Sequence, residues 1–170
     1  LISAFRAFLS QISKTTEDEA TLRWIGLTLM QLAEASMPAG DSIAKGQAAE
    51  LLGTAVDTFN QMKKNNEQVP LSIQFQLARA NRLLGNYKDA IKAYAALLAD
   101  KPMMLDAQME AALAYEQWAA TVDKKYTAAA YATALNGGKP DAKKKNIIWG
   151  WGKVSQLTSG DPKYRDMFFK

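Results

Sequence analysis

The stretch Leu71–Pro102 reads LSIQFQLARANRLLGNYKDAIKAYAALLADKP and predicts two short α-helices joined by a tight turn. On both sides of Gly85-Asn86, apolar residues recur at intervals of three and four, the spacing of an amphipathic helix. Glycine and asparagine are typical turn residues, and Pro102 closes the second helix because proline cannot continue one. The stretch therefore predicts one helical hairpin.

The composition of the 170-residue chain favours helix and excludes several kinds of chemistry. Cysteine and histidine are both absent, so disulfides, Cys/His zinc sites and Ser-His-Asp catalysis are impossible. Gly150–Ser155 (GWGKVS) is superficially similar to a phosphate-binding loop, but it lacks the earlier glycine and a preceding strand. The carboxylates are scattered without other catalytic features. The sequence therefore predicts a protein that is not an enzyme and has no cofactor.

No part of the sequence predicts a membrane span or a leader. No apolar run approaches the roughly 20 residues that a membrane-spanning helix needs. Leu1–Ser13 lacks the basic start and the cleavage site of a signal peptide. The sequence indicates no compartment, and both a cytoplasmic and an exported protein remain open.

Helical segments separated by turns are predicted along the rest of the chain. Thr16–Glu19 (TEDE) is expected to form a capping box, and Asp41 or Ser42 is expected to cap the following helix. The expected turns are near Thr15, Met37–Lys45, Asn65–Val69, Gly85-Asn86, Lys101-Pro102, Gly137–Lys139 and Ser159–Asp161. The last two expected helices are Asp141–Thr158 and one that starts at Tyr164–Lys170.

Small and aromatic residues recur in these helices at a fixed spacing. In the first stretch the pattern consists of Leu77-Ala78, Gly85, Tyr87, Ala90, Tyr94 and Pro102. The Ala-x-x-x-aromatic spacing of Ala90/Tyr94 returns at Ala55/Phe59 and at Ala4/Phe8. In each pair we expect the alanine to let two helices approach closely and the aromatic side chain to fill the gap beneath. This pattern resembles the tetratricopeptide repeat (TPR) family, whose repeats of about 34 residues are helical hairpins.

The resemblance implies an all-α fold, a right-handed αα-superhelix of TPR-like helix-turn-helix repeats. It implies a single solenoid over residues 1–170. The expected units are a half repeat at 1–14, pairs at about 16–64, 70–101 and 103–136, and a final partial pair at 140–170. A closed helical bundle has the same periodicity and is the competing fold, although the recurring small–aromatic pairs favour the solenoid.

The TPR resemblance implies a protein–protein interaction scaffold or assembly subunit. The partner is another protein or peptide, bound in the concave groove or at the solenoid ends, where further chain or self-association is expected to cover apolar residues. The candidate groove residues are Phe75, Arg79, Arg82, Met109, Leu113, Glu116 and Gln117. The two arginines are expected to hold a ligand carboxylate, or else to be solvated or paired with Glu110 or Glu116.

Basic residues are concentrated at the C-terminal end of the chain. Residues 1–120 carry 11 Lys/Arg and 13 Asp/Glu, whereas residues 121–170 carry 10 and 4. A candidate basic patch consists of Lys143, Lys144, Lys145 and Lys153, near Trp149 and Trp151. It indicates a solvated face or an acidic partner.

Two alternative functions remain open from the sequence. One is a basic nucleic-acid-binding helical module, because tryptophans between lysines can stack on bases, although such tryptophans more often belong to a core. The other is a helical accessory domain of a larger enzyme or envelope complex.

Overall fold

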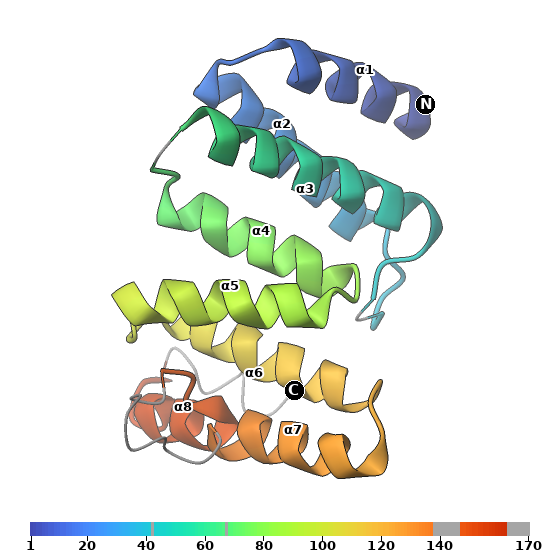
Figure 1. Ribbon diagram of the computed structural model, residues 1–170. Helices are drawn as coiled ribbons and strands as arrows, with labels where there is room; N and C mark the ends of the chain where they lie inside the picture. Colours follow the sequence, from blue (N-terminus) through green and yellow to red (C-terminus); the bar gives the residue numbers. More distant parts are fainter. Residues whose placement is uncertain (42, 67, 138–146, 163–170) are drawn as a thin grey trace. The chain divides into compact units, whose positions relative to one another are not determined.

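The computed structural model describes residues 1–41, 43–66, 68–137 and 147–162, which form eight α-helices and no strand (Figure 1). The predicted all-α fold is thereby confirmed. The chain divides into two compact units, Leu1–Ala90 (unit 1) and Ile91–Lys170 (unit 2). The helices are α1 (Ile2–Thr15), α2 (Glu19–Ala35), α3 (Gly46–Asn65), α4 (Leu71–Leu83), α5 (Tyr87–Asp100), α6 (Leu105–Ala119), α7 (Lys124–Asn136) and α8 (Gly150–Thr158).

The observed helix ends agree with most of the predicted turns. One turn was missed: Ala120–Asp123 separates α6 from α7, and the Asp123 carboxylate accepts hydrogen bonds from the amides of Lys125 (3.0 Å) and Tyr126 (3.1 Å). The helix expected from Asp141 is wrong for Ile147–Trp149, which are not helical. Ser42, residues 141–146 and the helix expected at Tyr164–Lys170 lie outside the described residues.

The caps of α2 and α3 differ from the expected ones. The N-cap residue of α2 is Asp18, whose Oδ2 accepts a hydrogen bond from the Thr21 amide at 2.7 Å. Thr16 instead bonds the Asp18 amide through its hydroxyl oxygen, at 3.2 Å. Asp41 does not cap α3, because the N-cap residue of that helix is Lys45.

In unit 1, α1 lies against the antiparallel pair α2 and α3, and α4 packs on the opposite side of α3 (Figure 1). The core of this unit includes Leu9, Leu22, Ile25, Leu29, Leu51, Leu52, Phe59, Met62 and Ile73. The contact between α2 and α3 depends on Gly26, since a Cβ there would overlap the ring of the fully buried Phe59. A glycine thus permits an aromatic ring to fill the gap between these helices.

Two of the three predicted small–aromatic pairs are buried. Both members are fully buried in Ala55/Phe59 and in Ala90/Tyr94. The prediction is wrong for Ala4 and Phe8, which are exposed, Phe8 by 59%. On α1 the fully buried residue is instead Leu9, because the apolar residues of this helix fall on two faces and only one meets α2 and α3.

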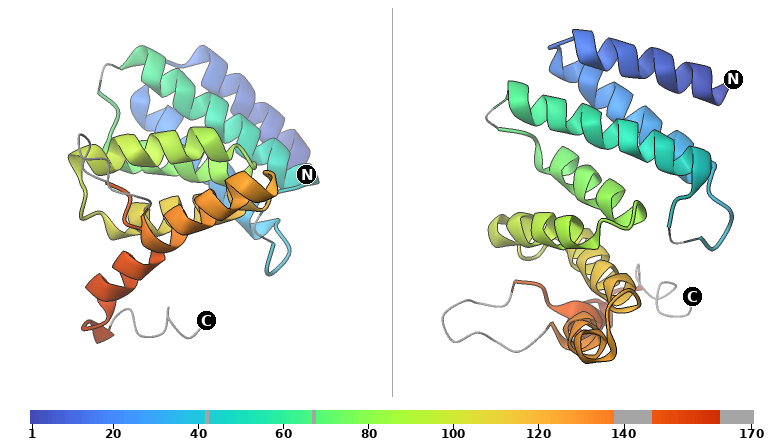
Figure 2. Two further views of the ribbon diagram at one scale, coloured as in Figure 1. Left: turned by 60° about the horizontal axis from the view of Figure 1, so that its bottom comes forward. Right: turned by 45° about the vertical axis from the view of Figure 1, so that its right-hand side comes forward.

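In unit 2, α6, α7 and α8 pack against one another (Figure 2). The fully buried Gln108 of α6 holds the segment before α8. Its amide nitrogen donates to the carbonyls of Ile147 (2.6 Å) and Pro102 (3.0 Å), and its Oε1 accepts from the Trp149 amide (2.7 Å). The bonds to Ile147 and Trp149 satisfy backbone groups that a longer α8 would have satisfied internally, which is consistent with the start of this helix at Gly150.

The glycines of the GWGK motif have a structural role in unit 2. Gly150 has a φ of 70°, and a Cβ there would lie 2.7 Å from the carbonyl oxygens of Thr133 and Ala134. At Gly152 a Cβ would lie 2.9 Å from the carbonyl oxygen of Leu135. The two glycines therefore allow the start of α8 to approach the end of α7 closely.

Candidate functional site

The candidate groove residues of α4 are engaged within the protein. Arg79 forms a two-pronged ion pair with Glu34 of α2, at 3.0 Å (Nη1–Oε1) and 3.2 Å (Nη2–Oε2). Arg82 is buried, with 4% of its surface exposed, and Phe75 is half-buried. Arg79 thus already holds a carboxylate within the protein, that of Glu34 on α2.

The candidate groove residues of α6 belong to unit 2. Met109, Leu113 and Gln117 are half-buried, and Glu116 is exposed. Oε2 of Glu116 accepts a hydrogen bond from the indole nitrogen of Trp151 at 3.2 Å. Because the α4 and α6 sets lie in different units, a groove shared by both stays a prediction.

The candidate basic patch falls largely outside the described residues, since Lys143, Lys144 and Lys145 lie there. Lys153 is exposed on α8, and its Nζ donates to Gln156 at 3.0 Å. The neighbouring Trp149 and Trp151 are both half-buried and bond to α6, which agrees with tryptophans that belong to the packing of unit 2.

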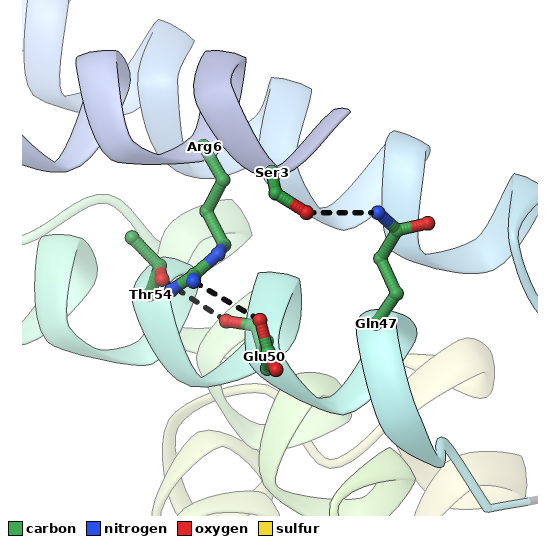
Figure 3. Close-up of polar contacts among 5 residues, drawn as sticks. All are labelled: Ser3, Arg6, Gln47, Glu50 and Thr54. Carbon is green, nitrogen blue, oxygen red and sulfur yellow. Dashed lines mark hydrogen bonds and ion pairs between the residues drawn. The ribbon is translucent and has the colours of Figure 1, made fainter. Parts of the chain in front are cut away.

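A different polar site lies between α1 and α3. These two helices run parallel and in register, so that successive side chains of one helix meet successive side chains of the other. Gln47 donates to the Ser3 hydroxyl at 3.4 Å, and Nη2 of Arg6 lies 3.0 Å from Oε2 of Glu50 (Figure 3). Both pairs join residues 44 positions apart in the sequence. A constant separation of this kind occurs only between parallel elements.

From Arg6 onward, the two helices enclose an open groove of about 800 Å³, here called the α1/α3 groove. It is lined by Arg6, Ser10, Ser13 and Lys14 of α1 and by Thr54, Asp57, Asn60, Gln61, Lys63 and Lys64 of α3. Ser13 and Thr54 are buried and bond carbonyl groups of their own helices, at 2.9 and 3.0 Å. Small side chains at these positions leave the space unfilled, and their hydroxyl groups make its walls polar.

The α1/α3 groove is electropositive. Its lining contains four cationic side chains and one carboxylate, that of Asp57. No carboxylate in the described part of the chain pairs with Lys14, Lys63 or Lys64. Arg6 is paired with Glu50, but the two side chains are 31% and 57% exposed, so this ion pair stabilises by at most about 1 kcal/mol.

Arg6 also has an unused donor. Its Nε is buried and has no hydrogen-bond partner among the described residues. An arginine binds a carboxylate most strongly with two parallel N–H bonds, whereas Glu50 takes only Nη2. The guanidinium is therefore incompletely satisfied at the mouth of the groove.

The second exposed feature of α1 is an apolar stripe on the face away from α2 and α3. Phe5 and Phe8 are 38% and 59% exposed, and Leu1 and Ala4 are exposed on the same face. Residues three or four apart on a helix are neighbours, so the stripe is continuous. An exposed continuous patch of large apolar side chains is typical of a docking surface.

Within the described ranges, no group of three or more acidic residues is placed to hold a metal ion. In the same ranges, no helix is both long and apolar enough to cross a membrane. No family model, no curated protein and no solved structure matches this chain. The resemblance to the TPR family therefore stays a prediction from the sequence.

Proposed function

We propose that this protein is a TPR-like scaffold or assembly subunit that binds another protein through α1. The observation that carries the proposal is the exposed apolar stripe around Phe5 and Phe8. In a stack of helices, such a face is covered by the next helix or by a partner, because the exposure of aromatic rings to water is unfavourable compared with their burial. A protein partner that presents an apolar face matches this surface.

A right-handed superhelix of helix pairs is the arrangement that we propose for the fold. In unit 1, α1 and α3 are parallel and in step, as expected for equivalent helices of successive pairs. Their separation of 44 residues exceeds the family period of about 34, because the segment between α2 and α3 is long. The buried pairs Ala55/Phe59 and Ala90/Tyr94 support the same arrangement.

The test is the double variant Phe5→Glu/Phe8→Glu, immobilised beside the native protein and exposed to extract from the native source. A partner should be retained by the native protein and lost from the variant, and the retained protein should bind again when purified. The control Met103→Glu/Leu157→Glu places the same charges at exposed apolar residues of unit 2. Identical retention by native protein and Phe5/Phe8 variant would refute binding through α1.

A further inference from the structure

The positive charge of the α1/α3 groove is a local concentration. Residues 1–90 carry nine Lys/Arg and nine Asp/Glu, so unit 1 has no net charge. Four of these nine cations line the α1/α3 groove: Arg6, Lys14, Lys63 and Lys64. The helix macrodipole favours lysine in the last turns of α1 and α3, but it favours no cation at Arg6, in the second turn of α1.

The state of Arg6 indicates that the groove accepts an anion. Its ion pair with Glu50 is exposed and readily exchanged, and its Nε has no acceptor. Because Nε is buried, the guanidinium must turn before an incoming carboxylate can take both Nε and Nη2; that contact would satisfy the donor and release Glu50 to solvent. In this exchange, the contact between Arg6 and Glu50 is replaced by two hydrogen bonds between Arg6 and the ligand.

The remaining lining residues favour a peptide over a nucleic acid. The carboxylate of Asp57 can accept hydrogen bonds from the N–H groups of a peptide backbone, which a phosphate backbone does not offer. Asn60 and Gln61 offer both donors and acceptors, which match the alternating groups of a peptide backbone. The lining contains no aromatic side chain on which bases would stack.

We propose that the α1/α3 groove binds an acidic peptide segment of a partner protein. The inference rests on the proposed protein-binding function and names the chemistry of the bound segment. Carboxylates of the peptide pair with Lys14, Lys63 and Lys64 and displace Glu50 from Arg6. The apolar stripe of α1 and the groove beside it would then contact adjacent parts of the same partner.

The experiment measures binding of the full chain to a short fluorescein-labelled peptide of alternating glutamate and serine, by fluorescence anisotropy. Peptide binding should weaken as salt is raised. The variant Lys63→Gln/Lys64→Gln should lose about fivefold or more in affinity. Ser10→Phe, which fills the groove without changing its charge, should also weaken binding and keeps the test valid if the lysine variant is poorly folded.

The matched control is Lys45→Gln/Lys88→Gln. These two exposed lysines also belong to unit 1 but do not line the groove, so the variant removes the same charge elsewhere. The control should bind the peptide as the native protein does. A parallel arm replaces the peptide by a single-stranded oligothymidine of similar length.

Three results would overturn the inference. The first is no binding of the acidic peptide, and the second is equal weakening in the groove and control variants. The third is tighter binding of the oligothymidine than of the peptide, with loss in the groove variants. None of these affects the proposed function, whose test depends on Phe5 and Phe8, so the two proposals fail separately.

Discussion

Gly26 and Gly53 are both helical glycines, and alanine is expected to change the stability in opposite directions. At Gly26 the new methyl group would overlap the ring of Phe59, which is fully buried and cannot turn away. At Gly53 nothing lies within 4 Å of the new atom. We expect Gly26→Ala to destabilise unit 1 by roughly 1–3 kcal/mol. Gly53→Ala should stabilise it by up to about 1 kcal/mol, because alanine favours helix.

The two free energies of unfolding are measured by urea denaturation followed by far-UV circular dichroism. Adding Phe59→Leu to Gly26→Ala should cost less than the two single changes together, since the smaller side chain removes the overlap. Strict additivity, or an unaltered stability of Gly26→Ala, would contradict the packing of α2 against α3.

Asp18 is expected to make the stability depend on pH in the acid range. Hydrogen bonds from the Thr21 side chain and from the Thr21 amide lower the pKa of the carboxyl below the usual 3.8. The folded protein therefore binds this proton less readily than the unfolded chain does. The stabilisation is complete above about pH 5 and is lost as the pH falls through the lowered pKa.

Asp18→Asn should keep the cap near neutral pH, because asparagine is an equally good N-cap residue, while it removes this part of the acid dependence. Unfolding free energies at neutral and acid pH give the comparison. Asp41→Asn, at an exposed aspartate that caps no helix, serves as control. If both variants follow the native pH profile, the hydrogen bond of Asp18 does not act as described.

At the scale of elements, the segment before α8 is held by a side chain of α6, that of Gln108. Gln108→Leu removes the donor to the Ile147 carbonyl and the acceptor for the Trp149 amide. Each buried backbone group left without a partner costs about 1–3 kcal/mol. Hydrogen exchange of the Trp149 amide should become faster. Gln108→Glu keeps the acceptor but not the donor, so its effect on this amide should be smaller.

Exposed Gln31 provides the matched control, because Gln31→Leu changes the same residue type without touching a buried backbone group. Equal exchange at Trp149 in the native and Gln108→Leu proteins would show that Gln108 does not hold the segment before α8.

The helices of this chain could be predicted from the sequence, and the reason is local. The helices are indicated by the spacing of apolar residues, and the turns by glycine, proline and asparagine. Both signals are contained in short segments, so they can be interpreted without knowledge of the fold. The turn at Ala120–Asp123 was not predicted, because it contains neither glycine nor proline and Asp123 is its only typical turn residue. Ala4 and Phe8 were misplaced because α1 has apolar residues on two faces, and spacing alone does not say which face is buried.

The candidate site could not be predicted, because it depends on how distant segments align. Ser10 and Thr54 are ordinary polar residues in the sequence, and they become groove walls only when α1 and α3 run in step. Glu34, which pairs with Arg79, is similarly a residue of α2, 45 positions away, and no local pattern marks this contact. Long-range register decides which side chains meet, and composition and periodicity carry no information about it.

At the scale of the whole molecule, the two units are expected to respond separately to a core change. The apolar core cluster that includes Leu9, Phe59 and Leu83 contains only residues of unit 1. Only α5 crosses from one unit to the other, at Ala90 and Ile91. In helical stacks, stability is carried by nearest neighbours, so a local defect raises the opening of its own region first.

Gly26→Ala and Gln108→Leu place one defect in each unit and serve as controls for each other. Hydrogen exchange followed by mass spectrometry should show faster exchange in α2 and α3 for Gly26→Ala, with α6–α8 nearly unchanged. Gln108→Leu should show the reverse, because the backbone groups that lose their bonds all lie in unit 2. Faster exchange throughout the chain in both variants would instead mean that α5 couples the units into one cooperative structure. In that case a partner bound at α1 would also stabilise α6–α8.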